Sequence, residues 1–349
     1  MSGPSITIPA APSIALYSGD AATWDAAVHA LPDATAAHLY AWKPLIEEVY
    51  QQECPYIAVR RSGRVTALLP LVDVRSVLFG RSLVSMPYLN SGGPIGNDSD
   101  IRALTEYAIQ FARSLRIDKL EFRALRELPI RMKPHAEKVG TVLNLPASSD
   151  ALWKALGSKL RSQIRRPQKE GVEMRFGPDQ VEPFFRVFSR NMRDLGSPTH
   201  AARFFTGIAQ RFGGRAWFGC AWLKGQPIAA GCGLQFGDEV EMTWASTIRE
   251  FNPVAPNMLL YWAFMERGIN QGLRRFNFGR STPGSGPHRF KLQWGARDVP
   301  LYWFRWPDTA SSMLRQESGT MSIATRVWQR LPVPLATAIG SRLRGGIPA

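Results

Sequence analysis

The chain has 349 residues, of which 45% are hydrophobic, enough for two domains with real apolar cores. Its 43 Lys and Arg against 28 Asp and Glu give a net charge of +15, which favours nucleic acid, an anionic membrane surface or a phosphorylated substrate without choosing among them. The three cysteines, Cys54, Cys220 and Cys232, lack metal-ligand spacing and are expected as reduced core thiols, as in a cytoplasmic protein.

The first half predicts two short helices, a run of strands, a longer helix and a closing strand. The expected helices cover 21–28, 41–49 and 101–115, and the expected strands cover 56–60, 65–71, 74–78, 83–88 and 119–123. The second half repeats this order, with strands at 217–223, 227–236, 240–246 and 275–278 and an apolar helix at 258–269. Corresponding elements are offset by roughly 155 to 160 residues, the length of a domain. We therefore expect two related α/β (α+β) domains, at 10–147 and 148–310, and a basic tail at 311–349.

The segment between the two halves, 150–172, is the most basic predicted helix. Its apolar residues Trp153, Leu156, Leu160 and Ile164 recur at helical spacing, and Lys and Arg cover the other faces. Pro167 should end or kink the helix, because it removes a donor and clashes with the preceding turn. Two interpretations remain open: a solvated face that connects the domains, or a helix that binds phosphate or an anionic surface.

Polar residues gather where the predicted helix 181–195 ends at Gly196, a residue suited to the left-handed conformation. Asn191, Asp194 and His200 fall within a few residues of this end, before the next helix at 201–212. We expect them on a loop rather than in a core.

The stretch 274–295 reads as a short strand, a turn rich in Gly, Ser and Pro, and a basic segment that ends at Trp294. Arg280, Arg289 and Lys291 lie on either side of the turn. Strand-to-loop transitions of this kind hold ligands in α/β enzymes, because the scaffold is rigid and the loop is free to vary. The alternative is a loop with solvated basic residues.

The tail is basic and contains Trp328, but Pro332 and Pro334 break any long amphipathic helix. No apolar run approaches the ~20 residues of a spanning helix, and the first residues lack a signal-peptide pattern. We therefore expect a cytoplasmic protein whose tail packs on its own surface. Reversible contact with the anionic inner face of the cytoplasmic membrane is the alternative for the tail.

Three segments together resemble a known bacterial group: NMRDLGSPTH at 191–200, FNFGRSTPGSG at 276–286 and KLQWG at 291–295. They are similar to FemAB-related proteins associated with exosortase/PEP-CTERM and exopolysaccharide systems. The basic stretch 161–171 also resembles that group, with Pro167 as a departure. The resemblance covers most of the chain and implies two tandem GNAT-like (acetyltransferase-like) domains, each a mixed, mainly antiparallel sheet flanked by helices.

The resemblance also implies a reaction, the transfer of an acyl group to an amine in bacterial cell-envelope or exopolysaccharide biosynthesis. FemAB proteins use aminoacyl-tRNA, and GNAT relatives use acyl-CoA, so either is the expected co-substrate, with no permanently bound cofactor. The expected acceptor is a small-molecule or lipid-linked amine. The chain shows no long charged helical hairpin of the kind that some tRNA-using members insert, which disfavours tRNA as a partner.

The GNAT likeness places the donor between the fourth and fifth strands, with its phosphates at the start of the following helix. We assign these elements to 227–236, 240–246 and the helix start near Pro256. The expected donor-binding residues are Gly231, Gly233, Leu234, Asn257 and Met258.

Acyl transfer needs a base for the amine and a donor for the developing oxyanion. We expect His200 or Asp194 as the base; a helix-capping or solvent-facing histidine and an ion pair of the aspartate with Arg193 or Arg190 are the alternatives. Arg280 is the third expected catalytic residue.

Cations and polar groups near the same turn are expected to hold the acceptor. Arg280 and Lys291 are expected to clamp its phosphate or carboxylate, and the remaining expected contacts are Arg289, Ser281 and Asn191. His288 is placed in a loop, and Glu241 is expected as a strand residue that is exposed or faces the cleft.

The sequence has no HExxH, CxxC pair or phosphate-binding Gly-x-x-x-x-Gly-Lys loop, so no metal site is expected. The competing function is a non-catalytic basic protein that binds a polyanion or a membrane surface. Oligomeric state stays open.

Overall fold

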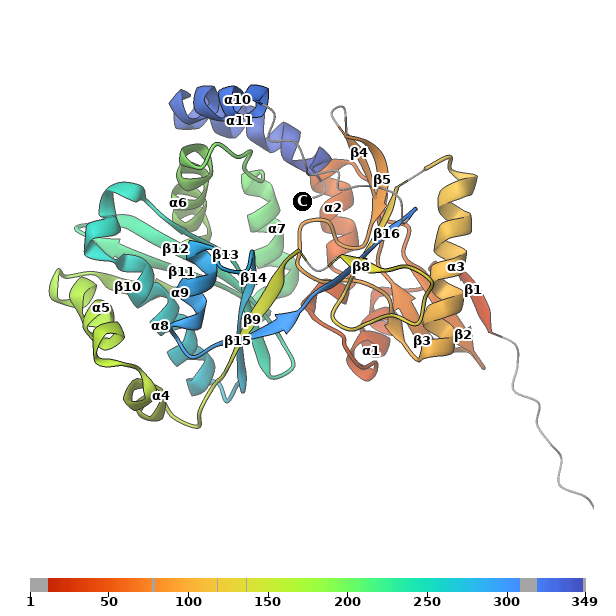
Figure 1. The fold of residues 1–349 in the computed structure, drawn as a ribbon, viewed down its shortest axis with the longest axis horizontal. Coiled ribbons are helices and arrows are strands. Elements are labelled where there is room, and N and C mark those ends of the chain that lie inside the picture. The colour runs from red at the N-terminus through yellow and green to blue at the C-terminus, as the bar shows by residue number, and fades with distance from the viewer. Residues whose placement is uncertain (1–11, 77–78, 118, 136, 308–318, 348–349) are drawn as a thin grey trace, which may run out of the picture.

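The computed structural model describes residues 12–76, 79–117, 119–135, 137–307 and 319–347, and side chains within 319–323 are left aside. Two lobes lie side by side, each built of sheets flanked by helices (Figure 1). The predicted α/β (α+β) class with mixed, mainly antiparallel sheets is therefore confirmed.

The first lobe contains two sheets. The four-stranded sheet has the order β1 (Ser13–Leu16), β2 (Ile57–Arg61), β3 (Arg64–Leu69), β6 (Ile95–Gly96). The five-stranded sheet has the order β4 (Val72–Ser76), β5 (Gly80–Val84), β7 (Leu120–Ala124), β16 (Tyr302–Trp306), β8 (Pro134–His135). The helices of this lobe are α1 (Ala21–Ala30), α2 (Trp42–Tyr50) and α3 (Asp98–Ser114).

The second lobe is built on one seven-stranded sheet. Its order is β10 (Glu173–Phe176), β11 (Ala216–Leu223), β12 (Gln226–Phe236), β13 (Glu239–Thr247), β14 (Arg275–Ser281), β9 (Val139–Asn144), β15 (Arg297–Pro300). The residues of α4 (Ser149–Ala155), α5 (Ser158–Lys169) and α8 (Pro256–Asn270) pack together on one face, and α6 (Val181–Asp194) and α7 (Ala202–Phe212) cover the other.

The lobes exchange strands. β9 precedes the midpoint of the chain but pairs with β14 and β15 in the second lobe. β16 comes after the second-lobe strands but pairs with β7 and β8 in the first lobe. A division at residue 147 therefore does not separate the sheets of the first lobe from the sheet of the second, and the chain crosses between lobes on both sides of the second-lobe core.

Two local expectations differ from the structure. The basic segment forms two helices, α4 and α5, which are separated at Leu156 and Gly157. Pro167 lies inside α5, which continues to Lys169 although the proline has no N–H to bond the carbonyl of Gln163. Most of the α5 cations are exposed, so anion binding by this helix stays a prediction.

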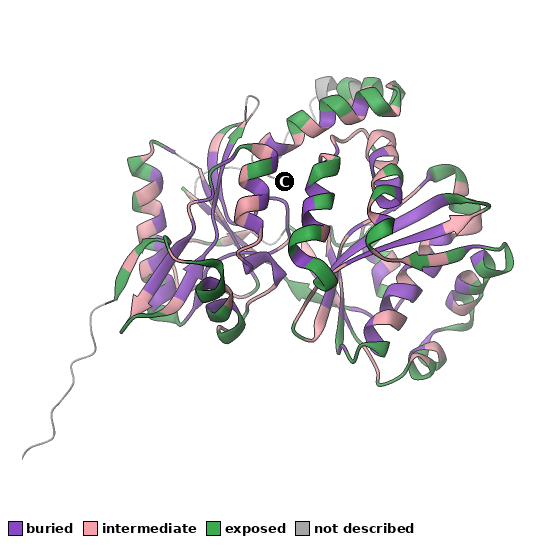
Figure 2. Ribbon diagram, turned by 180° about the vertical axis from the view of Figure 1, so that it is seen from behind, coloured by how far each residue is buried: buried purple, intermediate pink, exposed green. Residues whose placement is uncertain are grey.

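One hydrophobic core continues across the junction between the lobes. Trp42 of α2 packs against Phe212 of α7 with ring centroids 4.6 Å apart, and against Phe204 at 6.1 Å. Burial is concentrated in the sheets and on the inward helix faces (Figure 2). Because each fully buried large apolar side chain stabilises the fold by about 1.5–3 kcal/mol, this shared core holds the lobes together as one body.

The tail forms α10 (Gly319–Arg330) and α11 (Val333–Leu343), which lie beside α6 (Figure 1). Pro332 precedes α11, which confirms the predicted break. The chain then turns in η5 (Arg344–Gly346), where the Gly345 carbonyl accepts hydrogen bonds from Gln52 Nε2 at 2.7 Å and the Tyr88 hydroxyl at 2.9 Å. Thus the end of the chain docks on the first lobe.

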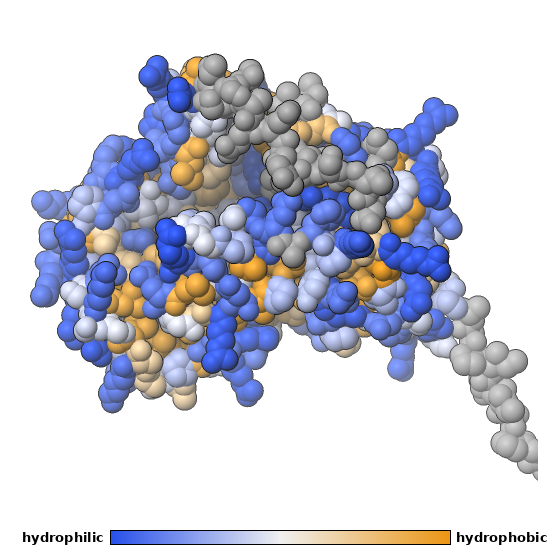
Figure 3. Space-filling view, viewed as in Figure 1, coloured by the Kyte–Doolittle hydropathy of each residue, from blue (hydrophilic) through white to orange (hydrophobic). Residues whose placement is uncertain are grey.

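Hydrophilic side chains dominate the face seen in Figure 3, which is hollowed between the lobes. Among the residues that the structure describes, no helix is both long enough and apolar enough to cross a bilayer.

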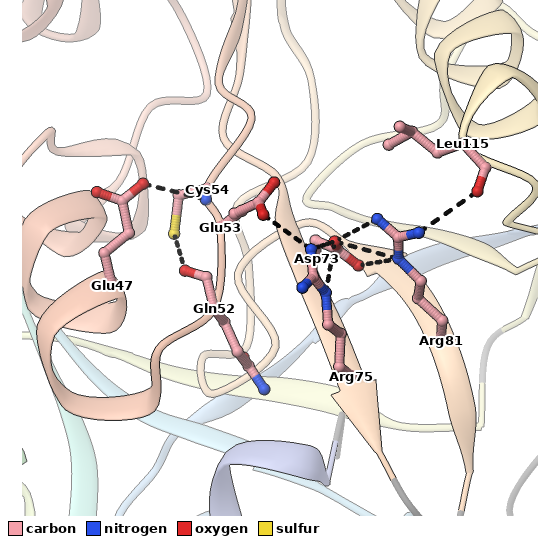
Figure 4. A network of polar contacts seen from close by, with 8 residues as sticks. All are labelled: Glu47, Gln52, Glu53, Cys54, Asp73, Arg75, Arg81 and Leu115. Carbon is pink, nitrogen blue, oxygen red and sulfur yellow. Dashed lines mark hydrogen bonds and ion pairs between the residues drawn. The ribbon is translucent and has the colours of Figure 1, made fainter.

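A buried carboxylate fixes the β4–β5 pair (Figure 4). Asp73 accepts hydrogen bonds from Arg81 Nη2 at 2.7 Å and from Arg75 Nη2 at 2.9 Å. Burial alone would raise the pKa of Asp73, but the bonds from Arg81 and Arg75 outweigh burial and hold the pKa below its usual value. The two guanidinium groups thus compensate for a charge that would otherwise be costly to bury.

Candidate active site

The candidate site begins where two parallel strands of the second lobe part. β13 and β14 pair only from Glu239 with Arg275 to Glu241 with Asn277. On its other edge β14 pairs with β9 from Arg275 to Ser281, with an irregularity between Asn277 and Arg280. The sheet therefore opens at Glu241, and the end of β13 has no strand partner on that side.

Asn90 of the first lobe enters this opening. Its Nδ2 donates a hydrogen bond to Glu241 Oε1 across the junction between the lobes. Gly279 has φ +70°, and a Cβ there would lie 3.1 Å from Asn90 Nδ2, so a side chain would press against the amide. The close approach of Asn90 to β14 thus depends on a glycine at position 279.

A cavity of about 710 Å³ lies at this junction. The first lobe contributes residues of three loops, and the second contributes β9, β13, β14 and β15. Its lining includes Asp33, Thr35, Asn90, Ser91, Glu239, Glu241, Asn277, Gly279, Arg280 and Arg297. The volume is within the ~300–1,000 Å³ of typical ligand sites.

Glu241 is a half-buried carboxyl whose pKa lies near neutral pH. The net pKa is about 7. Burial is the largest cause of the rise and Glu239 adds to it, whereas the hydrogen bond from Asn90 and the charges of Lys291 and Arg280 lower the pKa. A carboxyl with this pKa can take up and release a proton at physiological pH.

Lys291 lies on α9 (Gly286–Leu292), a helix that the sequence did not predict within the basic segment. Its Nζ donates to the carbonyls of Gly279 and Arg280, both at 2.9 Å. Burial lowers the pKa of Lys291 to about 8, with Glu241 raising it and Arg280 lowering it. An ammonium has three N–H donors, and these two carbonyls account for two of them.

His288 fixes α9 rather than lying in a loop. The side chain is buried, with Nε2 2.9 Å from Asp298 Oδ1 and with Nδ1 accepting from the Gly284 amide at 3.0 Å. Ser285 caps the helix by accepting from the His288 amide at 3.3 Å. The α9 contacts thus position Lys291 against the end of β14.

Arg280 lies over the ring of Trp303, 5.0 Å from its centroid, with no hydrogen-bond or ion-pair partner for its guanidinium among the described residues. The pKa of Arg280 is lowered to about 10, chiefly by burial and also by the nearby charges of Arg123 and Arg344. It therefore has donors to offer to an anion in the cavity it lines.

The expected base His200 lies in the interior instead of at the cavity. It is 2% exposed and stacks on Phe204 with ring centroids 4.5 Å apart, and its Nδ1 faces the Tyr50 hydroxyl. Burial, followed by the charge of Arg344, lowers the pKa of His200 well below its ordinary value. Asp194 forms an ion pair with Arg193 at 2.7 Å, the alternative that the sequence left open.

The expected donor-binding strands do not diverge. β12 and β13 stay paired from Ala229 with Thr247 to Phe236 with Glu239, so no opening lies between these two strands, the strands that part are β13 and β14, and donor binding by the predicted residues stays a prediction. Gly231 and Gly233 lie under α8, where an added Cβ would be 3.2 and 3.3 Å from Phe264, and Leu234 is buried in the shared core.

The other predicted residues lie around the opening in different settings. Asn191 donates to Ser246 at 3.0 Å, near the end of β13. Ser281 is buried on β14, and Arg289 is exposed and donates to the Gly284 carbonyl. Asn257 and Met258 lie in the first turn of α8, which has no side-chain cap, and Met258 packs into the core.

Sequence reasoning missed the role of the first lobe in this site. Glu241 could be placed on its strand face by the alternation in Glu239–Thr247, but its partner Asn90 is 151 residues away. No cluster that could hold a metal ion occurs among the described residues.

Comparisons with known proteins concern the fold. Residues 157–292 match the family profile described as acetyltransferase (GNAT) domain. No curated protein sequence matches the chain.

Three solved structures extend the likeness to both lobes. The structure of FemX has a TM-score of 0.62 at 13% identity, over 83% of this chain and 96% of that one. A C-terminal domain of a putative lysylphosphatidylglycerol synthetase from Agrobacterium fabrum has 0.56 at 13%, over 88% and 94%. A tandem GNAT protein from the clavulanic acid biosynthesis pathway has 0.50 at 13%, over 86% and 100%. The expected tandem GNAT-like fold is confirmed, and the association with exosortase systems stays a prediction.

Proposed function

We propose that this protein is an N-acyltransferase that moves an acyl or aminoacyl group from a thioester or ester donor to an amine. The observation that carries the proposal is the meeting of Glu241, Lys291 and Arg280 where β13 and β14 part. This meeting point lies within the stretch that matches the acetyltransferase (GNAT) domain. A group that exchanges a proton near neutral pH, a buried cation and a strand opening are what acyl transfer requires.

The donor would lie in the opening between β13 and β14. From Met242 to Thr247 the β13 backbone lacks a strand partner on that side, so its peptide groups can bond an extended chain. Phosphates of the donor would meet the start of α8, where no side chain caps the helix and the Met258 amide is bonded to the Ala255 carbonyl at 3.0 Å, so that the Asn257 amide is the one offered. Acyl-CoA is the co-substrate that this arrangement favours, and aminoacyl-tRNA is the second donor to test.

Glu241 would act as the general base, oriented by Asn90. The amine nitrogen bonds to the carbonyl carbon, its proton passes to Glu241, and the carbon–sulfur or carbon–oxygen bond to the donor breaks. The third N–H of Lys291 would bond the developing oxyanion, a contribution of about 3–4 kcal/mol in other acyl-transfer sites. The leaving thiolate or alkoxide then takes the proton from Glu241.

The acceptor would occupy the 710 Å³ cavity, which both lobes line. We infer a small-molecule or lipid-linked amine of bacterial cell-envelope or exopolysaccharide biosynthesis, supported by the likeness of the fold to FemX and to the synthetase domain. A lipid-linked acceptor would be met at the cytoplasmic face of the membrane, where a net charge of +15 favours reversible contact.

Transfer can be tested with labelled acyl-CoAs and charged tRNAs offered together with amine acceptors. The wild type should label an amine, and Lys291→Met should lose about 10²–10³-fold in rate. Lys154→Met removes an exposed cation of α4 and is the matched control, with an unchanged rate expected. A wild type that neither binds nor consumes a donor of either class would contradict the proposal.

A further inference from the structure

The loop between β5 and β6, residues 85–94, brings Asn90 of the first lobe to Glu241 of the second, and we call it the Asn90 loop. Its backbone has an unusual shape, because Met86 has φ +51°, in the left-handed region that residues other than glycine seldom adopt. Gly92 has φ +126°, and a Cβ there would lie 2.5 Å from Met86 Cγ. A shape of this kind persists only where surrounding groups hold it. The place of Asn90 therefore depends on contacts from outside the loop.

Arg123 of β7 makes the first set of these contacts. It is 1% exposed, and its Nη1 donates hydrogen bonds to the carbonyls of Pro87 at 2.7 Å and Leu89 at 2.9 Å. The Arg123 amide donates to Ser85 Oγ at 2.8 Å, and the Arg123 carbonyl accepts from the Gly93 amide at 2.8 Å. Both ends of the Asn90 loop and its middle are thus bonded to one residue.

Tyr88 connects the same loop to the tail. Its hydroxyl lies 2.8 Å from Gln52 Oε1 and 2.9 Å from the Gly345 carbonyl, which also accepts from Gln52 Nε2 at 2.7 Å. All three residues are buried. Because a buried polar group without a partner is costly, these bonds keep Tyr88 beside η5.

The part of the loop after Asn90 has separate contacts. Ser91 Oγ lies 3.0 Å from Thr35 Oγ1, and the Gly93 carbonyl lies 3.0 Å from His38 Nε2. These contacts fix the end of the loop that leads into β6. The part that precedes Asn90 is held by the two sets of bonds described above.

The tail reaches Tyr88 from the second lobe. Gly340 of α11 lies against the segment that follows α6, where an added Cβ would be 2.9 Å from the Thr199 amide nitrogen. Gly345 lies against the first lobe, where an added Cβ would be 2.8 Å from Cδ1 of Tyr50. The two glycines thus allow the tail to cross the junction in close contact with both lobes.

We propose that Arg123 and Tyr88 are positioning residues, which hold the Asn90 loop in place for the acyl transfer proposed above. The amide of Asn90 is thereby kept on the Glu241 carboxyl. The inference rests on the proposed function, because its effect on the reaction passes through Glu241. Neither positioning residue lines the cavity of about 710 Å³. The tail takes part through the Gly345 carbonyl, 257 positions along the chain from Tyr88.

The pKa of Glu241 reports the place of Asn90 whether or not the protein transfers an acyl group. Carbon-13 NMR of the glutamate carboxyl groups measures it, with the signal assigned by its absence in Glu241→Gln. Asn90→Ala should raise the proton affinity of Glu241 by about 10-fold, because the bond from Asn90 lowers this pKa. The other charges that face Glu241, those of Glu239, Lys291 and Arg280, are the same in every variant compared.

Tyr88→Phe and Arg123→Lys should each raise the proton affinity of Glu241 by at least about 3-fold. Tyr88→Phe removes only a hydroxyl, and Arg123→Lys keeps the charge but loses the fork that bonds several groups at once. Tyr50→Phe is the matched control. Its ring packs 4.9 Å from that of Tyr88, but its hydroxyl faces His200 instead of the Asn90 loop, so the pKa should not change.

A double variant separates positioning from a general loss of structure. In Asn90→Ala/Tyr88→Phe the proton affinity of Glu241 should equal that of Asn90→Ala, because the group that Tyr88 positions is already absent. Additive changes would mean that Tyr88 acts on Glu241 by another route, and would overturn the proposal. An unchanged pKa in Tyr88→Phe, with the thermal transition of a folded protein, would overturn it as well. Should Arg123→Lys not fold, Tyr88→Phe alone decides.

This proposal and the proposed function fail separately. A protein that shows these pKa changes but transfers no acyl group keeps the positioning residues and loses the function. A protein that transfers acyl groups, but whose Glu241 pKa does not depend on Tyr88, does the reverse. Where both hold, Tyr88→Phe should lower kcat/KM near pH 7 by about 3-fold and recover at pH 8.5, which a merely structural role would not produce.

Discussion

His200 and Glu241 lie in two regions of the same interlobe junction, and their surroundings give them opposite chemistry. His200 stacks on Phe204 and lies edge-on to Trp244 in a filled core, and burial keeps it neutral. Glu241 lines a cavity of about 710 Å³ with charges nearby, and its pKa rises to about 7. Residue type made the histidine the better candidate, but access to a cavity favours the carboxyl.

The same contrast separates the two guanidinium groups that lie over Trp303. Arg123 is 4.2 Å from the ring centroid, bonds Glu121 at 2.9 Å and donates to the carbonyls of Pro87 at 2.7 Å and Leu89 at 2.9 Å. Arg280 lies at 5.0 Å and lines both the cavity of about 710 Å³ and a second one of about 230 Å³. Arg123 is therefore bonded within the fold, whereas Arg280 faces cavities that could hold a ligand.

The largest effect is expected from Glu241→Gln, which keeps the shape and removes the base. We expect a loss of about 10²–10⁴-fold in kcat/KM, and loss of the rise in activity through pH about 7 that the wild type should show. Steady-state rates from pH 5.5 to 9 measure both. If this variant kept the wild-type pH profile, another group would be the base.

The pH dependence of the free energy of unfolding should report the raised pKa of Glu241 independently of activity. Its pKa is raised in the folded state, so the unfolded chain loses the proton first and the wild type becomes less stable as pH rises from about 4 to about 7. Glu241→Gln should lack this component, which urea unfolding at several pH values would show as a smaller decline than in the wild type.

Lys291 should set the other side of the pH profile. Its pKa is about 8, so the ammonium is progressively lost above that pH and kcat/KM should fall. Because Glu241 and Lys291 influence one another, the two limbs near 7 and 8 belong to the pair. Lys291→Met, slower by about 10²–10³-fold, should lose the decline above pH 8. A decline that persists in this variant would assign it to a different group.

An intermediate effect is expected from Asn90→Ala. The hydrogen bond from Asn90 lowers the pKa of Glu241, so removing it should move the acidic limb to higher pH. Rates near pH 7 should fall by about 10-fold and recover in part at pH 8.5, since a hydrogen bond to a charged group contributes about 1.5–3 kcal/mol. Ser91→Ala, at the neighbouring cavity residue, is the control and should leave the limb in place.

The sequence predicted what local patterns determine and missed what distant pairing determines. Alternation and helical spacing located β11, β12, β13, α6, α7 and α8 within a few residues, and Gly196 has the expected left-handed conformation at φ +74°. The exchange of β9 and β16 could not be predicted, because short strands carry no sign of a partner that is more than 100 residues away.

The candidate site divides along the same line. Arg280 and Lys291 were predicted from one continuous stretch, whereas the hydrogen-bond partner of Glu241, Asn90, lies in the other lobe. The burial of His200 could not be predicted for the same reason, because Tyr50, whose hydroxyl faces its Nδ1, is 150 residues away. Burial by distant segments decides the pKa of a group, and a sequence pattern shows only its near neighbours.

The smallest effect on activity is expected from His200→Phe. This variant tests whether the buried His200 has a structural role only. His200 is surrounded by the rings of Phe204, Phe205 and Trp244, so an aromatic replacement should keep the packing, at the loss of the bond to Tyr50. We expect kcat/KM within about 3-fold of the wild type and a change of about 1–2 kcal/mol in the free energy of unfolding. Thermal unfolding and rates measured on the same sample separate the two effects. A loss of about 10²-fold or more in rate without a loss of stability would return the role of base to His200, because only a group that handles a proton in the reaction would be missed in this way.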